Sequence, residues 1–414
     1  MKHNVMKVLI IGLTWPEPKA TAAGVRMLQL MEVLKKNDCT ITFATTAIKP
    51  HGHGDEHALG VETVSIELNS TTFDNFIGKL QPQIVVFDRF LTEEQFGWRV
   101  VEHCPNALRI LDTEDLQSLR TARQEAVQKG IPFTTSIWLN HGKTLREVAS
   151  ILRCDLSLII SDFELELLQE HAKISAHLLM HLPFFSEVEK EEKKAYGFRQ
   201  RGDFLFMGGG KHAPNIDAIL YLKKELWPSI KHQLPRAALN IYGAYLPQSI
   251  LDLHNPKEGF LVHGRAESAP AVMEKARVCL APLRFGAGIK GKLWQAMQCG
   301  TPSVTTPIGA EGMHGGLPWN GTVAQTDEEF VEAAVALYTN ASLWEESQKN
   351  GQRLLEERYN IDIWPQAFIE RLKEVQHQLA ANRSANLMGR LLHHHAFQST
   401  KYLSKWIALK NKDH

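Results

Sequence analysis

The sequence predicts an α/β protein built from two doubly wound domains of similar size. Short apolar runs alternate with longer amphipathic runs along most of the 414 residues, and one charged stretch at 186–203 interrupts them. Several apolar runs are continuous in Val, Ile and Leu, which is typical of parallel strands covered by helices on both faces. The length exceeds one ordinary hydrophobic core and suits two or three domains.

Seven strands are expected in the first domain, which we place at residues 1–185. They are the apolar runs 7–13, 40–45, 61–68, 82–88, 108–112, 155–160 and 177–182. Amphipathic helices are expected between them, for example at 22–36, 93–103, 140–153 and 161–171. This alternation predicts a Rossmann-like, doubly wound domain.

The stretch SEVEKEEKKAYGFRQRGD at 186–203 has no apolar period and is interpreted as a linker. A second α/β series follows at 204–361. Its expected strands are 204–208, 239–243, 260–264, 277–282, 302–306 and 321–325, and its expected helices are 214–233, 266–276, 290–299, 327–338 and 341–356. Ligands of such sheets bind beyond the carboxyl ends of the strands, so the loops of both domains are expected to face a central cleft.

The end of the chain predicts helices of a different character. Residues 362–380 suggest one amphipathic helix that packs back toward the first domain, and residues 381–414 a basic amphipathic tail. Six cations in the tail oppose only Asp413, and Trp and Tyr accompany its leucines. This pattern suits an anionic membrane surface. The alternative is a helix docked on the protein's own surface or on a partner.

The composition excludes several classes of protein. Lys plus Arg and Asp plus Glu balance at 46 each, so no overall charge favours nucleic acid. The five cysteines are widely spaced without a CxxC pair, which indicates buried thiols in a reducing compartment. The first apolar run is too short for a signal peptide, and no run approaches the length of a membrane span. We therefore expect a cytoplasmic protein.

The loop FGAGIKG at 285–291 predicts an anion site, because it follows a strand and enters a helix. Glycines allow close approach to the backbone, and the first N–H groups of a helix are unpaired donors beside a positive dipole end. Lys290 adds a full charge at this entrance. On the helix itself, spacing places Leu293, Ala296 and Met297 on the core face, Lys292 and Gln295 on a neighbouring face, and Gly300 after the last turn. A plain glycine-rich turn with solvated lysines is the alternative.

Two further segments have the same strand-loop-helix character. FMGGGKHAPN at 206–215 places three glycines and Lys211 before a helix that Pro214 begins. In the first domain, a long loop after the first strand ends near Thr21, with Gly24 and Arg26 in the first turn of the next helix. LDTEDLQSLRTAR at 111–123 places acidic, amide and arginine side chains just past a strand. A capping residue and a solvated helix face would also explain the latter segment.

Histidine-rich segments do not predict a metal site. HGHGDEH at 51–57 lies in a glycine-rich loop without a carboxylate arrangement that supports coordination, and His393 to His395 cannot converge on one ion from a helix. The sequence also lacks the GxSxG, HExxH and Walker-type patterns.

Three stretches together resemble a known family. They are FMGGGKHAPNIDAILYL (206–222), FGAGIKGKLWQAMQCGTPSVTTPIGAEGM (285–313) and ISDFELELL (160–168). They resemble signature stretches of the retaining glycosyltransferases of GT-B fold, the family 4 or "group 1" type. The resemblance extends to about residue 378 and is most specific at 285–313.

The resemblance implies transfer of a sugar from a nucleoside diphosphate-sugar, held by the second domain without a metal or other cofactor. It implies an acceptor held by the first domain, such as a growing cell-surface polysaccharide or a glycolipid. Lys290 and Lys211 would contact the phosphates, Gly24 and Arg26 would form a loop between donor and acceptor, and Asp115 and Gln117 would lie on the acceptor side. The donor site would further include Gly208, Gly209, Gly210, Gly286, Gly288, Ile289, Gly291, Gln295 and Glu311.

The chain departs from the family's pattern at three positions. Paired glutamates are frequent in the family, and here Ala287 and Gln295 stand in their places; the GAGIKGK subgroup generally lacks the first glutamate but keeps the second. Gln117 stands where a histidine is frequent, and an amide cannot shuttle a proton. These departures leave open a weakened or inactive GT-B protein that binds nucleotide or a partner enzyme. A nucleotide-sugar epimerase of the same fold is a third possibility.

Overall fold

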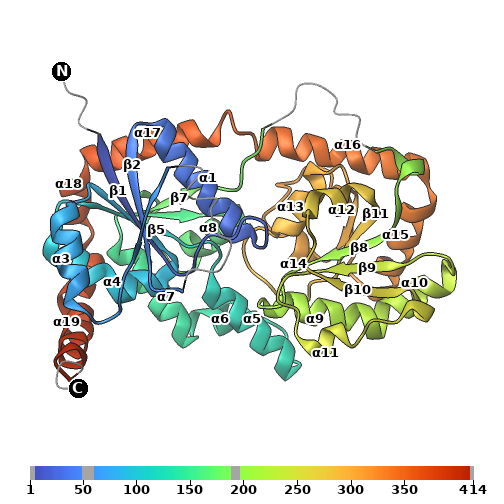
Figure 1. Cartoon of the computed structure of the whole chain (residues 1–414), viewed down its shortest axis with the longest axis horizontal. Helices are drawn as coiled ribbons and strands as arrows, with labels where there is room; N and C mark the ends of the chain where they lie inside the picture. The colour runs from blue at the N-terminus through green and yellow to red at the C-terminus, as the bar shows by residue number, and fades with distance from the viewer. Residues whose placement is uncertain (1–4, 49–59, 188–195, 411–414) are drawn as a thin grey trace.

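The computed structural model describes residues 5–48, 60–187 and 196–410, and it confirms the predicted α/β architecture (Figure 1). Two parallel sheets lie side by side, each covered by helices on both faces. The histidine-rich segment 51–57 lies outside the described residues. All five cysteines are buried free thiols, as their spacing predicted.

The first sheet contains seven parallel strands within the described residues, in the order β3-β2-β1-β4-β5-β6-β7. The strands are β1 (Met6–Gly12), β2 (Cys39–Thr45), β3 (Glu62–Ser65), β4 (Ile84–Asp88), β5 (Leu108–Asp112), β6 (Leu156–Ile159) and β7 (Leu179–His181). The helices are α1 (Ala22–Lys36), α3 (Thr71–Leu80), α4 (Arg89–His103), α5 (Gln117–Lys129), α6 (Thr135–Leu139), α7 (Gly142–Arg153) and α8 (Asp162–Glu170). Strand order reverses between β1 and β4, and β1 is buried on both faces because helices cover both.

The second sheet contains six parallel strands in the described chain, in the order β10-β9-β8-β11-β12-β13. The strands are β8 (Gly202–Met207), β9 (Leu239–Tyr242), β10 (Phe260–Gly264), β11 (Ala276–Ala281), β12 (Ser303–Thr305) and β13 (Gly321–Val323). The helices are α9 (Ala213–Tyr221), α10 (Trp227–Gln233), α11 (Gln248–Leu251), α12 (Ala269–Lys275), α13 (Gly291–Gln298), α14 (Pro307–Ala310), α15 (Asp327–Thr339) and α16 (Ala341–Arg358). Strand order reverses between β8 and β11, so the two glycine-lysine loops follow the strands that flank this switch point, where ligands of such sheets bind.

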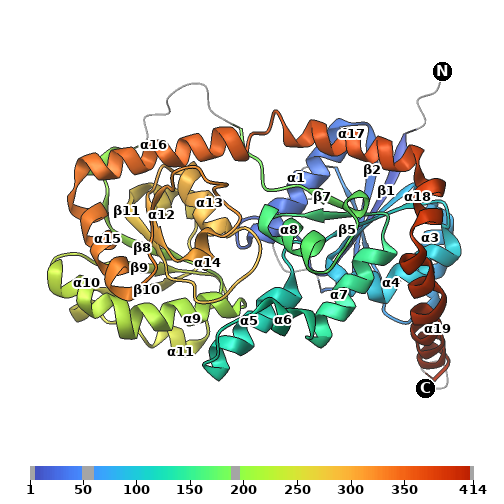
Figure 2. The same cartoon turned by 180° about the vertical axis from the view of Figure 1, so that it is seen from behind.

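After α16 the chain returns to the first domain. Helix α17 (Trp364–His377) contributes Phe368, Leu372 and Val375 to a hydrophobic cluster that also contains Leu30 and Ile41. At this crossing, the Ser186 N–H donates to the Tyr359 carbonyl (2.8 Å), so the two segments that connect the domains run side by side. Helices α18 (Leu379–Ala385) and α19 (Leu387–Lys410) then follow the outer edge of the first domain (Figure 2).

Several predicted elements differ from the structure, and two of the differences have a clear physical reason. Strand β8 begins at Gly202, inside the predicted linker, because the backbone of Gly202 pairs with Ala276 although no apolar side chain marks the start. The helix predicted at 214–233 is divided by a π-helical turn at Leu222–Leu226. Pro228 follows directly and lacks the N–H that an uninterrupted α-helix would use, which explains the altered hydrogen-bond pattern.

Candidate active site

The carboxyl ends of the two sheets meet at the loop that connects β11 to α13. Gly288 of this loop has a φ of +62°, and its N–H donates to Glu164 Oε1 of the first domain (2.8 Å). A Cβ on Gly288 would lie 2.8 Å from the Asp115 Cβ, and a Cβ on Gly291 would lie 2.3 Å from the Ala22 Cβ. The first domain therefore occupies the space that side chains would need, and only glycine fits at these two positions.

Lys290 lies at the N-terminal end of α13, where the sequence placed it. Its side chain is buried at 7% exposure, and its Nζ donates to the Gly288 carbonyl (2.8 Å). Burial lowers the pKa of Lys290 from 10.5 to about 8, against the opposing effects of Glu311 and Glu164. A buried cation beside the free N–H groups of a helix end is suited to a phosphate group.

A second lysine, Lys292, connects the two glycine-rich loops. Its Nζ donates to Asn215 Oδ1 (2.5 Å), and Asn215 Nδ2 donates to the Gly209 carbonyl (2.9 Å). Burial lowers the pKa of Lys292 from 10.5 to about 7. The sequence gave Lys292 no role in the site, although its spacing of three residues from Gln295 placed both on one face.

The loop after β8 is closely packed. A Cβ on Gly208 would lie 2.6 Å from Asn215 Cγ, and a Cβ on Gly210 would lie 2.2 Å from the Tyr245 carbonyl oxygen. Lys211, predicted to contact phosphate, is exposed, and its Nζ lies 3.8 Å from the centroid of the Tyr245 ring. The Tyr245 hydroxyl donates to Glu17 Oε2 of the first domain (2.7 Å), which places Lys211 next to a contact between the domains.

The positions at which the chain departs from the glycosyltransferase pattern have different environments. Ala287 is buried and belongs to the hydrophobic cluster of the first domain, together with Leu116 and Ile159. Gln295 is half-buried on α13, one turn from Lys292. Ile289, also predicted in the donor loop, is buried in a cluster with Ile160 and Phe184.

The acceptor-side loop is held by two buried glutamates that the sequence analysis did not assign. Glu164 Oε1 accepts from the Leu116 N–H (3.0 Å) as well as from Gly288, and Glu147 Oε1 accepts from the Gln117 N–H (2.9 Å). Burial raises the pKa of Glu164 to about 8 and that of Glu147 to about 7. Glu164 lies within ISDFELELL, a stretch quoted for its resemblance but without a role for any residue.

Asp115 and Gln117 both lie at this loop, as expected from their position past β5. The Asp115 carboxylate pairs with Arg120, and its Cβ is the atom closest to the space beside Gly288. Gln117 is the first residue of α5 and is half-buried. The structure thus brings Asp115 against the loop that carries Lys290.

The predicted residues Gly24 and Arg26 are both engaged within the first domain. Arg26 is buried, and its Nε donates to Asp112 Oδ1 (2.9 Å) while its Nη1 donates to the Leu182 carbonyl (2.6 Å). A Cβ on Gly24 would lie 2.4 Å from the Glu17 carbonyl carbon, which explains the glycine. These contacts hold the loop between β1 and α1 in position.

Arg123 joins the first domain to two segments of the second domain, the 285–291 loop and Glu311. Its Nη1 and Nη2 donate to Glu311 Oε1 and Oε2 (2.7 and 2.8 Å), and Nη1 also donates to the Gly286 carbonyl (2.9 Å). The Arg123 side chain is almost completely buried, and its guanidinium lies near the rings of Phe133 and Phe163. Glu311, predicted to line the donor site, is therefore also a contact between the domains.

Within residues 5–48, 60–187 and 196–410, no group of three or more His, Cys, Asp and Glu side chains is arranged to hold a metal ion. His393 instead lies 2.9 Å from the Arg153 carbonyl oxygen.

Comparison with known proteins agrees with the resemblance seen in the sequence. Residues 201–340 match the family described as Glycosyl transferases group 1. No curated protein matches the sequence.

Solved structures match over most of the chain. Sucrose-phosphate synthase from Thermosynechococcus elongatus is 14% identical with a TM-score of 0.67, over 91% of this chain and 99% of that one. Alr3699/HepE from Anabaena, in complex with UDP and glucose, is 12% identical with a TM-score of 0.65, over 89% and 99%. WaaG, a glycosyltransferase involved in lipopolysaccharide biosynthesis, is 14% identical with a TM-score of 0.59, over 87% and 98%. These similarities show that the chain has the GT-B fold, and within it residues 201–340 match the group 1 glycosyltransferases.

Proposed function

We propose that the protein transfers a sugar, with retention of anomeric configuration, from a nucleoside diphosphate-sugar to a glycan or lipid-linked acceptor. The observation that carries this proposal is the burial of Lys290 at the start of α13, on the loop that meets the first domain. A fixed cation in a site shielded from water stabilises developing negative charge more strongly than a solvated one. Negative charge develops in this way when a nucleoside diphosphate departs from a sugar.

Each lysine has a separate role in this proposal. Lys290 and the first N–H groups of α13 bind the β-phosphate, whose bond to the sugar breaks. Lys292 extends the positive charge toward the 208–210 loop, which it reaches through Asn215. The two lysines supply the charge that a divalent cation would otherwise provide, so we propose transfer without a metal.

The acceptor side supplies position rather than a base. The side chain of Gln117 cannot accept a proton at neutral pH. We therefore assign the proton of the acceptor hydroxyl to the departing phosphate oxygen on the same face of the sugar, which is consistent with retention. The Asp115 Cβ lies beside Gly288 of the Lys290 loop, and in this proposal the Asp115 carboxylate orients the acceptor hydroxyl.

The nature of the substrates rests on the relatives. HepE is described in complex with UDP and glucose, which supports a nucleoside diphosphate-sugar as the donor. WaaG is involved in lipopolysaccharide biosynthesis, which supports a cell-surface glycolipid or polysaccharide as the acceptor.

The donor assignment can be tested by calorimetry with UDP, GDP, ADP and CDP on the wild type and on Lys290→Ala. We expect one diphosphate to bind and the variant to bind at least about tenfold more weakly, since a charge-assisted contact is lost. Lys257→Ala, which removes an exposed lysine of the same domain, is the matched control. Equal binding by wild type and Lys290→Ala would contradict the assignment.

Activity separates transfer from the other functions of this fold. Incubation of the matching nucleotide-sugar with candidate acceptors should release nucleoside diphosphate, and Lys290→Ala should lower the rate about 10²-fold or more. Isomerised donor in the absence of acceptor would instead identify an epimerase. Nucleotide binding without turnover of any donor would identify a non-catalytic protein.

A further inference from the structure

Helix α19 is docked on the first domain by one face. It lies along α7 and α4 in both views (Figures 1 and 2). The docked face includes Gly389 and Ser404, which are buried, and His393, which is half-buried. The Ser404 hydroxyl accepts from Arg99 Nη2 (3.1 Å), and Lys401 pairs with Glu102 (2.7 Å). The helix is therefore fixed in orientation along much of its length.

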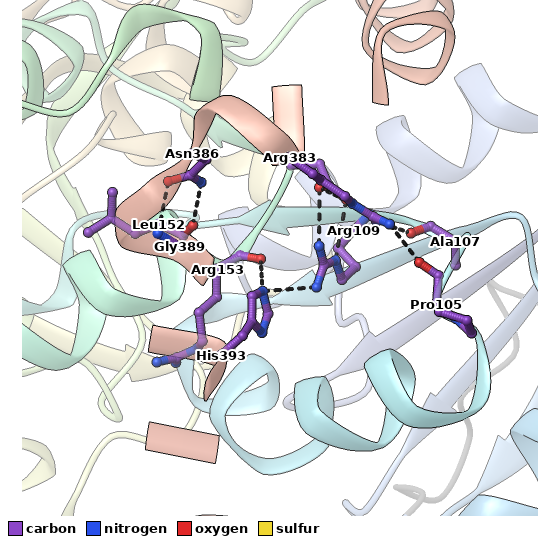
Figure 3. Close-up of polar contacts among 10 residues, drawn as sticks. Pro105, Ala107, Arg109, Leu152, Arg153, Arg383, Asn386, Gly389 and His393 are labelled. Atoms are coloured by element: carbon purple, nitrogen blue, oxygen red, sulfur yellow. Dashed lines mark hydrogen bonds and ion pairs between the residues drawn. The ribbon is translucent and has the colours of Figure 1, made fainter. Parts of the chain in front are cut away.

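The start of the helix is anchored by a polar network (Figure 3). Arg383 of α18 donates to both carboxylate oxygens of Asp155 (2.7 Å each), which also pairs with Arg109. Asn386 Nδ2 donates to the Leu152 carbonyl (2.8 Å). A Cβ on Gly389 would lie 2.3 Å from that same carbonyl oxygen, so the helix approaches α7 as closely as a glycine allows. This anchor sets which side of α19 faces away from the protein.

The outward face of α19 is a stripe of large apolar side chains. Successive helical residues are about 100° apart, which places most of these side chains opposite Gly389, His393 and Ser404, with Leu403 at the edge of the set. The members, with their exposed fractions, are Leu387 (60%), Met388 (58%), Leu391 (45%), Tyr402 (65%), Leu403 (56%), Trp406 (59%) and Leu409 (63%). Half or more of most of these side chains faces solvent, although each would gain free energy from burial. We call this set the apolar stripe.

The charged side chains of α19 itself all have one sign. Residues 387–410 contain no Asp or Glu, and the exposed cations Arg390, Lys405 and Lys410 belong to the same helix. Lys405 is 3.9 Å from Glu102 and 51% exposed, so its charge is largely available to an external anion. Trp and Tyr in the stripe are the residues enriched where an apolar layer meets a polar one.

We propose that α19 seats the protein on an anionic lipid surface, with the apolar stripe in the headgroup region and the cations on the phosphates. None of the helices in the described chain is long and apolar enough to cross a bilayer. A helix with an apolar face flanked by cations lies in the plane of the interface. A second copy of the chain fits less well, because two such helices would bring like charges together along their length. This inference does not depend on the transfer activity.

Flotation with vesicles tests the proposal on the full chain. We expect binding to vesicles of phosphatidylcholine with phosphatidylglycerol, and much weaker binding to phosphatidylcholine alone or at high salt. The double variant Trp406→Gln/Leu409→Gln should bind at least about tenfold more weakly, because two side chains that would insert are lost. Leu145→Gln/Ile363→Gln, which changes two exposed apolar residues outside α19, should bind like the wild type.

Two further measurements keep the test decisive. The variants should keep the wild-type unfolding midpoint, because the altered side chains are exposed and do not hold α19 in place. Lys405→Gln/Lys410→Gln should weaken binding to anionic vesicles with little effect on neutral ones. Equal flotation of the wild type and Trp406→Gln/Leu409→Gln would overturn the proposal. A wild-type dimer that this variant dissociates, without vesicle binding, would overturn it in favour of a second copy.

Discussion

The two domains bring opposite kinds of ionisable side chain to the place where they meet. The second domain contributes Lys290 and Lys292, whose pKa values are lowered by burial. The first contributes Glu164 and Glu147, whose pKa values are raised by burial. In both domains burial disfavours the charged form, but the lysines follow glycine loops whereas the glutamates lie on helices and hold loop N–H groups. In the proposed mechanism the lysines of the second domain bind the ligand. The glutamates of the first domain fix the conformation of the loops by accepting hydrogen bonds from their N–H groups.

The largest effect is expected where the domains touch most closely. Gly288→Ala would force a side chain into left-handed backbone, 2.8 Å from Asp115. We expect kcat/KM to fall about 10²-fold, because a displacement of about 1 Å in the Lys290 loop is sufficient. Gly78→Ala on α3, where no atom lies within 4 Å of the new Cβ, should leave activity unchanged. Full activity in Gly288→Ala would show that contact between the domains is not needed for transfer.

A smaller effect is expected at the contact that joins α5 to the donor loops. Arg123→Ala and Glu311→Gln should each lower kcat/KM, and the double variant should lose little more than either alone. The coupling free energy between the buried Arg123 and the half-buried Glu311 should be about 2 kcal/mol. The exposed pair Arg353 and Glu357 on α16 is the control, with a coupling near zero in unfolding experiments. Additive losses of kcat/KM would show that Arg123 and Glu311 act independently and would contradict the prediction.

The two kinds of buried charge predict opposite dependences of stability on pH. The pKa of Glu164 is raised from 4.5 to about 8, so between these values the folded state keeps a proton that the unfolded chain releases. Its contribution to stability is present at low pH and is lost as the pH rises. The free energy of unfolding of Glu164→Gln should therefore rise by about 2 kcal/mol relative to that of the wild type between pH 6 and pH 8, measured by urea unfolding.

The buried lysine Lys290 predicts the opposite dependence of stability on pH. The pKa of Lys290 is lowered from 10.5 to about 8, so between these values the unfolded chain binds the extra proton and stability rises with pH. Lys290→Met should flatten this rise, measured in the same unfolding experiment. Glu166→Gln, which changes an exposed carboxylate on the same helix as Glu164, is the control. Parallel curves for all three variants would disprove the charge contrast between the domains.

The smallest effect is expected at Gln295. Gln295→Glu places a carboxylate one turn from Lys292 and offers a charged acceptor to a ribose hydroxyl. The donor KM should fall several-fold, which corresponds to about 1 kcal/mol between a neutral and a charge-assisted hydrogen bond. Gln298→Glu, at an exposed position of the same helix, should change nothing. A rise in KM would show that the pocket is built around the amide.

The features that the sequence predicted correctly are those whose residues lie close together in the chain. Lys290 was found because a strand, three glycines and a helix start lie within a few residues of it, and β5 and β10 were predicted to the residue from their apolar runs. The partner of Gly288 could not be found this way, because Glu164 lies 124 residues away. In the sequence Arg123 is only one of several polar residues, because its ion-pair partner Glu311 lies 188 residues away. Only the packed fold brings such pairs together.

The return of the chain through α17 has a consequence for the order in which the protein forms on the ribosome. Phe368, Leu372 and Val375 complete a core whose other members come from the first strands and helices. The first domain is therefore made almost entirely before its last core residues leave the ribosome exit tunnel. The second domain, contiguous from β8 to α16, has all its strands earlier than that. We expect the domain synthesised second to reach its native structure first, and the domain synthesised first to wait for the end of the chain.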